Sequence, residues 1–329
     1  MKRHRAPRAR LLLLLLAAAC LVPVHSALEA QVTPELLLAP WSDEPHWVES
    51  RNEFLFFDHG RVKKTGERVE TFVWDSVGRV KFPRAESEPM FHFGYKVHVL
   101  DVDTDNDAVT GQLNDIALLP AFDSVEFLED WRLSLAGGFG TANDGHWTDV
   151  DSAYGLAIVD FSRRLESGDE LHLGLAHDGN RGMFPDVPLP FVAYQGTFGE
   201  DFEYTFGVPH AAAAYEAFED FELSLRYDFP VDVSLVADYA IGKGFHVFAS
   251  YARSLDGFVL DGRDHRRIFH EVDRVTAGLR WASHWFDASV GVGYALAQRF
   301  RTGFDMRSLE TTADLSEEVF LAIMVQGRL

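Results

Sequence analysis

Carboxylates at alternate positions form the most suggestive chemical motif of this sequence. Residues 101–107 read DVDTDND and place acids at Asp101, Asp103, Asp105 and Asp107. Alternating oxygen ligands are typical of calcium loops, in which a glycine makes the sharp turn and a bidentate glutamate closes the shell. Here Asn106 and Gln112 occupy those two positions. Two interpretations stay open: a solvated acidic loop that caps the preceding segment, and a weak Ca²⁺ site, which is the only cofactor the sequence suggests.

A second group of charges alternates with apolar residues along extended segments. Its members are Arg226, Arg274, Arg280, Glu222, Asp238 and Asp287. If these segments are barrel strands, the six side chains share the inner face and line the lumen. They then either close a narrow lumen by salt bridges or line a constriction that selects charged solutes. Opposite signs are interspersed, which favours the salt-bridge network.

Histidines raise the alternative of a barrel lipid hydrolase with a Ser/His pair at the wall. His172, His177, His265 and His270 lie near the ends of extended segments, and Asp178 and Glu271 adjoin two of them. A catalytic triad is defined by spatial geometry. The sequence contains no Gly-x-Ser-x-Gly elbow and no His-Glu-x-x-His motif. We therefore predict no enzymatic activity and assign no catalytic residue.

The elements that position these residues are segments in which apolar and polar side chains alternate with a period of two. The alternation is clearest at 91–99, 131–139, 171–175, 202–208, 221–227, 233–241, 275–281, 286–296 and 319–329. A period of two indicates β-strands with one apolar face. Both a soluble sandwich, with that face inward, and a membrane barrel, with that face toward lipid, have this period.

Three features favour the barrel. Many segments have about 9–12 residues, the length of a tilted strand that crosses a bilayer. Aromatic residues recur at segment ends, as in an interfacial girdle, and the opposite face is small and polar. The sequence thus predicts an all-β, closed antiparallel transmembrane barrel of about 12 strands, within a range of about 10–14. We place the barrel at 68–329 and a periplasmic lead-in segment at 27–67.

The connections predict which end of the barrel is outside. Residues 242–244 and 282–284 form tight turns, whereas 255–270 and 297–316 are long and polar. Bacterial barrels have short periplasmic turns and longer external loops. If the chain end is periplasmic, both long connections lie outside and both tight turns inside.

The N-terminus is predicted to be a secretory signal peptide over 1–26. A basic stretch precedes the apolar run Leu11–Ala19, and small residues at Val24 and Ser26 predict cleavage before Ala27. The apolar run is too short to span a bilayer as a helix. Cys20, the single cysteine, follows three alanines that weakly resemble a lipoprotein box; an ordinary leader cysteine is the simpler interpretation.

The net charge of the chain limits the classes of molecule that it can bind. The formal charge is −21, and loss of the leader, with five basic residues and no acid, makes it −26. Such a surface repels phosphate backbones, so nucleic acid is excluded, whereas cations and small solutes are suited. The predicted location is the outer membrane, with its lipid as the main partner. The sequence predicts no oligomeric state.

One stretch carries a resemblance to a known family. Residues 153–227 contain Tyr154-Gly155-Leu156-Ala157, Glu170-Leu171-His172-Leu173-Gly174-Leu175, Pro188-Leu189-Pro190-Phe191, Gly207-Val208-Pro209, Ala214-Tyr215 and Phe221-Glu222-Leu223-Ser224-Leu225. This pattern resembles a family of bacterial outer-membrane barrels known only as a domain of unknown function, over about residues 90–329. The resemblance implies the barrel fold and an outer-membrane location. It implies no reaction, no substrate and no functional residues.

Two functions stay open besides the hydrolase. One is a porin-like barrel that passes small solutes through a polar lumen. The other is a non-conducting structural or surface-interaction barrel whose acidic external loops are the working part.

Overall fold

The structure is a computed structural model. It describes residues 47–82, 90–106, 109, 111–128, 130–147, 150–229, 231–262 and 266–328. The predicted signal peptide, its cleavage site, Cys20 and most of the lead-in segment lie outside these residues. Within the described chain, no helix is long and apolar enough to cross a membrane.

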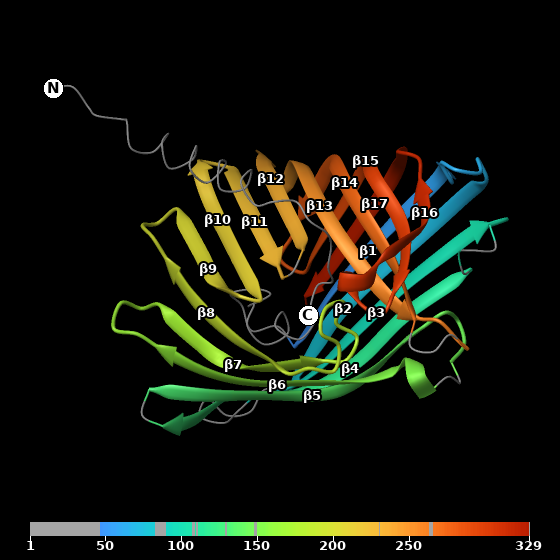
Figure 1. The fold of residues 1–329 in the computed structure, drawn as a ribbon. Helices are drawn as coiled ribbons and strands as arrows, with labels where there is room; N and C mark the ends of the chain where they lie inside the picture. The colour runs from blue at the N-terminus through green and yellow to red at the C-terminus, as the bar shows by residue number, and fades with distance from the viewer. Residues whose placement is uncertain are drawn as a thin grey trace.

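The described residues form seventeen β-strands in one sheet (Figure 1). The strands are β1 (Val48–Arg61), β2 (Arg68–Phe82), β3 (Met90–Thr104), β4 (Gln112–Leu128), β5 (Trp131–Asn143), β6 (Ala153–Arg164), β7 (Glu170–Asp178), β8 (Leu189–Thr197), β9 (Phe202–Val208), β10 (His210–Phe218), β11 (Phe221–Asp228), β12 (Asp232–Gly242), β13 (Phe245–Val259), β14 (Arg267–Ala282), β15 (Phe286–Gly303), β16 (Glu310–Leu315) and β17 (Glu318–Arg328). Two single-turn 3₁₀ helices accompany them, η1 (Val150–Ser152) and η2 (Met306–Ser308).

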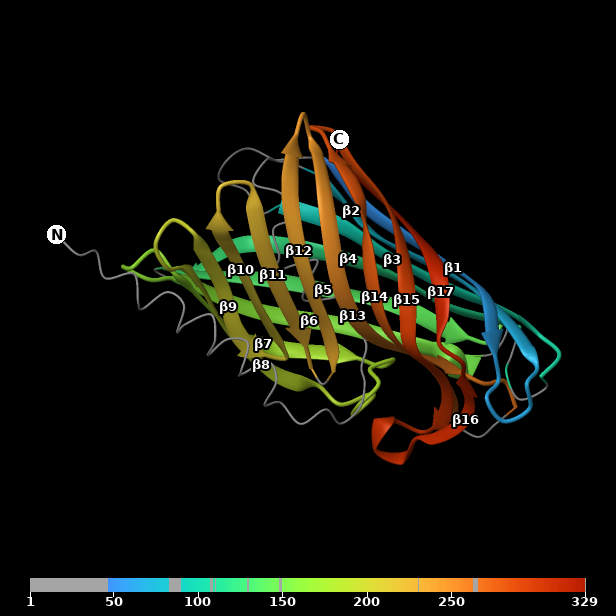
Figure 2. The ribbon, with the colours of Figure 1, turned by 90° about the horizontal axis from the view of Figure 1, so that it is seen from above.

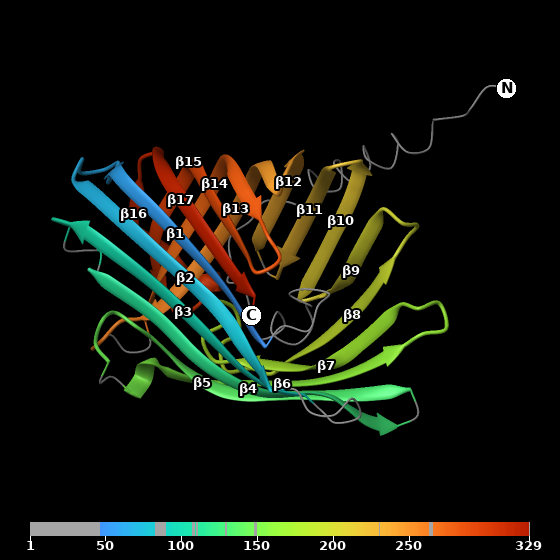
Figure 3. The same ribbon diagram turned by 180° about the vertical axis from the view of Figure 1, so that it is seen from behind.

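The sheet closes on itself. From β1 to β15 each strand pairs antiparallel with the next, and β17 pairs with both β15 and β1. Because β16 and β17 pair with successive parts of β15, they occupy one position of the ring, which therefore has sixteen. Figures 1 and 3 show β10–β17 on one side of the molecule and β2–β8 on the other. The predicted all-β, closed antiparallel barrel is confirmed.

The predicted number of about 12 strands is wrong. The missing strands lie where alternation is hidden: β10 begins with four successive alanines after His210, so neither face differs from the other. The predicted lead-in segment contains β1, yet this strand pairs with β2 and β17 inside the wall. Its run Phe54-Leu55-Phe56-Phe57 is apolar on both faces because Leu55 and Phe57 pack inside. The barrel thus begins at Val48, not at residue 68.

The apolar face points outward, as predicted. Leu279, Val292 and Val319 expose 51%, 61% and 59% of their surface, and their neighbours along each strand face the interior. Toward one end of the molecule this outward face becomes charged. A row of alternating ion pairs runs from β13 to the end of β1, with N···O distances of 2.7–3.8 Å, through Arg253, Glu271, Arg299, Asp314 and Lys63.

The two ends of the barrel differ. We call the end where β1 begins and β17 finishes the termini end, since Glu49 pairs with Arg328 there, and the opposite end the far end. Residues 243–244 and 283–285 turn at the termini end, whereas 260–266 and 304–309 connect strands at the far end. The long loops predicted at 255–270 and 297–316 are mostly strand, because β13, β14 and β15 continue toward the far end. Both faces mix apolar and polar residues there: His270 and Gln298 lie on the inner face beside Phe300, and Leu255 and Phe269 lie on the other face beside Glu271. The alternation is therefore hidden.

The far end is pinched. β13 and β5 lie on opposite sides of the ring, yet Val259 forms a parallel bridge with Asn143, and the Asp261 amide donates to Asp144 Oδ2 at 3.0 Å. Between β1–β4 and β13–β17 an apolar core fills the interior, with Phe57, Leu100, Phe258, Phe300 and Phe320 among its members. Figure 2 shows the two groups of strands from above, where β13–β17 overlap β1–β4 in projection.

Candidate functional site

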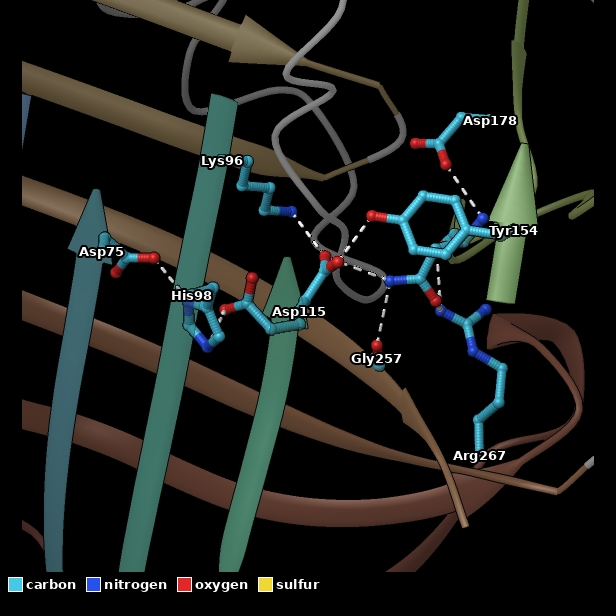
Figure 4. A network of polar contacts seen from close by, with 10 residues as sticks. Asp75, Lys96, His98, Asp115, Tyr154, Asp178, Gly257 and Arg267 are labelled. Atoms are coloured by element: carbon cyan, nitrogen blue, oxygen red, sulfur yellow. Dashed lines mark hydrogen bonds and ion pairs between the residues drawn. The ribbon is translucent and has the colours of Figure 1, made fainter. Parts of the chain in front are cut away.

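The connection between β7 and β8 lies across the lumen. We call residues 179–188 the lumen loop. Its Asn180 side chain donates to Asp115 Oδ2 on β4 at 3.2 Å and to the Gly257 carbonyl on β13 at 3.1 Å. Because β4 and β13 are not neighbours of β7 or β8, the loop leaves its own part of the wall and reaches the opposite side (Figure 4).

Arg267 on β14 holds this loop. Its guanidinium donates to the Arg181 carbonyl at 3.0 Å and to both the carbonyl and the side-chain oxygen of Asn180 at 2.6 Å. The Arg267 side chain also stacks on Phe269, 4.7 Å from the ring centre. Gly257 permits this approach, because a Cβ there would meet the Arg267 guanidinium. Planar guanidinium donors suit such convergent carbonyls.

Arg181 fixes the shape of the lumen loop from within. It exposes 1% of its surface, and its guanidinium donates to the carbonyls of Ala176 and Val187 at 3.1 and 3.0 Å. The short helix η2 supports the loop from β15–β16: the Met306 amide donates to the Gly182 carbonyl at 3.0 Å, and Arg307 lies over the Phe184 ring at 4.6 Å.

Asp305 orders η2. Its carboxylate accepts from the Arg307 amide at 3.0 Å, as a helix-capping residue does. Burial alone would raise the pKa of the Asp305 carboxyl, but hydrogen bonds and the charge of Arg307 lower it below its usual value. The Asp305 carboxyl is therefore ionised at neutral pH.

Asp115 is the hub of the network on the opposite wall. It accepts from Tyr154 Oη at 2.5 Å and from Lys96 Nζ at 2.8 Å, in addition to Asn180. A small pocket opens beside it between Lys96, Tyr154 and Asp178. Charge-assisted bonds of this kind compensate the cost of burying a carboxylate.

A second polar chain crosses the interior nearby. His98 on β3 bonds through Nδ1 to Asp75 on β2, and its Nε2 lies 4.0 Å from Asp256 on β13. The His98 ring lies 5.5 Å from that of Phe258, at the edge of the apolar core. Figure 4 shows both chains linking β2–β4 to β13 and β14.

Five of the six predicted lumen residues form ion pairs, and the partners differ in whether the sequence suggested them. Arg274 pairs with Glu53 at 2.8 Å; β14 and β1 are not neighbours, so this pair lies inside the barrel. Arg280 and Asp238 lie 3.5 Å apart. The remaining two pairs involve partners that the sequence did not suggest, Arg226 with Asp228 at 2.5 Å and Asp287 with Arg328 at 2.6 Å. These contacts fit the salt-bridge interpretation for five of the six.

Glu222 belongs to a different group. We define the acidic strip as Glu203 on β9, Glu216 on β10 and Glu222 on β11. All three side chains are exposed, and their neighbours Thr205, Ala214 and Ser224 on the same face make that part of the wall small and polar. Among the described residues, none of the three forms an ion pair. Because the three glutamate side chains are exposed, this part of the interior is accessible to water.

The acidic run does not assemble a metal site in the described chain. Asp101 and Asp103 are exposed and alternate with the buried Val102 at the end of β3, and Asp107 lies outside the described residues. Within the ranges given above, no group of three or more His, Cys, Asp or Glu side chains could hold a metal ion. Calcium binding stays a prediction.

Of the described histidines of the hydrolase hypothesis, His172 and His270 are buried, whereas His177 on β7 is half-buried. His172 lies on the inner face beside Asp160, with Nδ1 2.9 Å from its carboxylate. His270 exposes 2% of its surface and stacks on Phe300 within the apolar core. His265 lies outside the described residues. The His172 and His270 rings do not reach the outward face, where a membrane lipid would bind. His177 follows the exposed Leu175 on the outward side of β7.

Sequence reasoning missed Asp115, Asn180 and Arg267. The turn-forming run Asp178-Gly179-Asn180-Arg181-Gly182 indicates a loop that is not a tight hairpin. Nothing in it indicates the strands that the loop contacts, because Asn180 and Arg267 are 87 residues apart.

Comparison with known proteins gives similarities only among solved structures. No family model matches the sequence, and no curated protein matches it. The chain is similar to a deletion mutant of the TodX monoaromatic hydrocarbon channel, with 9% identity over 92% of this chain and 96% of that one and a TM-score of 0.42. It is also similar to an outer membrane channel from Pseudomonas putida F1 (12% identity, 88% and 98% coverage, TM-score 0.36) and to Pseudomonas aeruginosa OccK7 (11%, 86% and 98%, TM-score 0.35).

Proposed function

We propose that this protein is an outer-membrane channel that passes small cationic solutes. The observation that supports this most directly is the opposite character of the two faces of one closed wall. Outward residues are exposed leucine, valine and phenylalanine, whereas inward residues of β9–β12 are polar, charged and accessible to water. The resemblance to the uncharacterised outer-membrane barrel family, and export through the predicted signal peptide, belong to this proposal.

The membrane location rests on strand length and closure. β7–β12 have 7–11 residues, close to what a tilted membrane strand needs. A closed barrel satisfies every backbone hydrogen bond within the wall, as a bilayer requires. The exposed end of the charged row, Lys63 with Asp314, fits the level at which the wall leaves the apolar part of the membrane. A barrel of this strand number has room for an aqueous passage.

The solute class rests on charge. The two arginines beside the acidic strip are already paired, Arg226 with Asp228 and Arg280 with Asp238. The three glutamates of the strip therefore leave an excess of negative charge on the wet wall. Such an excess concentrates cations and repels anions.

Conductance across planar bilayers tests the proposal. We expect discrete current steps and a reversal potential that favours K⁺ over Cl⁻ in a KCl gradient. The triple variant Glu203→Gln, Glu216→Gln and Glu222→Gln should move the reversal potential toward zero. The matched control, Asp101→Asn with Asp103→Asn, removes carboxylates from the outward face and should leave it unchanged.

A second candidate, a non-conducting surface barrel, is favoured by one observation. The apolar core and the lumen loop together obstruct the far end. If folded protein, recognised by faster gel migration unheated than boiled, gives no current steps at any voltage, the scaffold is the better explanation. Anion preference in the wild type would instead contradict the solute class alone.

A further inference from the structure

We infer that the lumen loop is a gate, held closed by a latch that Arg267 and Asn180 form. The inference rests on the proposed channel function and adds to it the part that moves. The path that the gate controls runs along the acidic strip, on the side of the lumen that the apolar core does not fill. In the structure described here the latch is formed.

The wall and the loop are held in different ways. Strands of the wall are joined by continuous ladders; β13 and β14 alone pair over fifteen residues. The loop has few backbone bonds of its own, such as Arg181 to Asp178 at 3.2 Å and Val187 to Phe184 at 3.3 Å, and its first residue, Gly179, donates to Gly155 of β6 at 3.0 Å. Its position across the lumen therefore depends on contacts with the opposite wall, and these can break without disturbing a ladder.

Those contacts converge on two side chains. Asn180 bridges Asp115 and the Gly257 carbonyl, and Arg267 donates three hydrogen bonds to residues 180 and 181. Both side chains are at least nine-tenths buried. Two further attachments hold the loop: the Met306 amide donates to the Gly182 carbonyl of the loop, and Met183 packs against the buried Leu255 and Phe269. If the latch opens, the loop withdraws toward β7 and β8, and the carbonyls of 180 and 181 gain water in place of Arg267.

Covalent locking gives the first test. The Met306 nitrogen lies 3.0 Å from the Gly182 oxygen, so these two residues meet at the contact and are the pair chosen for an engineered disulfide. In a Cys20→Ala background, Gly182→Cys with Met306→Cys should conduct when reduced and spend at least about tenfold less time open when oxidised. The background protein under the same oxidant is the control.

The two ways of failing are distinguishable. If the reduced protein conducts and oxidation forms the disulfide without changing the open time, the gate is wrong and the channel stands. If neither form conducts, the channel proposal fails and the gate fails with it.

Breaking the latch gives the opposite expectation. Arg267→Ala removes three hydrogen bonds from a charged donor, so the open time should rise about tenfold or more. Gly257→Ala keeps the charge but displaces the guanidinium and should act in the same direction. Arg163→Ala, at an exposed pair with Asp130 near the termini end, should have no effect. Unchanged open times in both latch variants, with a normal gel mobility shift, would overturn the inference.

Discussion

Strands β13–β15 have 15–18 residues and β8–β11 have 7–9, although both groups belong to one closed sheet. The long strands continue past the outward apolar face, turn over the lumen at the far end and bury Phe258 and Phe300 against β1–β4. The short strands end with that face, and their inner side meets water. The comparison shows that one wall can supply a dry core at one side of its interior and a wet passage at the other.

The largest expected effect comes from replacing one phenylalanine by alanine on each side of the barrel. Phe300 is fully buried in the apolar core, so Phe300→Ala should lower the free energy of unfolding by about 3–5 kcal/mol. Phe206 on β9 exposes 59% of its surface outward, and Phe206→Ala should cost far less. Denaturant titration of protein refolded in lipid vesicles measures both. Equal losses would mean that the far end is not a packed core.

A carboxylate on each side provides the next test. Asp115→Asn leaves Lys96 buried beside a neutral amide, so we expect a loss of about 1–3 kcal/mol in the same titration. Glu222→Gln, which removes an unpaired charge from the wet wall, should leave the free energy of unfolding unchanged. A destabilising Glu222→Gln would show that the acidic strip is structural, which would contradict its assignment as a solute path.

The smallest expected effect concerns pH at the far end. Hydrogen bonds and the charge of Arg307 hold the folded-state pKa of Asp305 below its ordinary value of 3.8, so its contribution to stability is complete above that value. The contribution is lost as the pH falls from about 3.8 through the lowered pKa. The free energy of unfolding of Asp305→Asn should therefore fall less over this interval than that of the wild type. Parallel curves would indicate that the contact with Arg307 is not formed in the membrane.

How much the sequence predicted depends on the kind of contact. Period-two segments such as 221–227 and 286–296 identified strands and their outward faces correctly, because alternation is a property of neighbouring residues. The run Phe54–Phe57 and the alanines of β10 concealed two strands, because both faces there have similar side chains. The sequence predicted Arg274, Arg280 and Asp238 as lumen residues, but it did not predict their partners; Arg274 pairs with Glu53, 221 positions away.

The alternation and turn residues of the sequence therefore determined the fold class, the apolar exterior and the end of the barrel at which the longer connections lie. Tertiary structure decided the number of strands, the pinch between β5 and β13 and the place of the lumen loop. The physical reason is that closure and cross-lumen contacts depend on the register of the whole ring. No short window of residues encodes that register, so Asn180 and Arg267 gain a shared role only once the ring has closed.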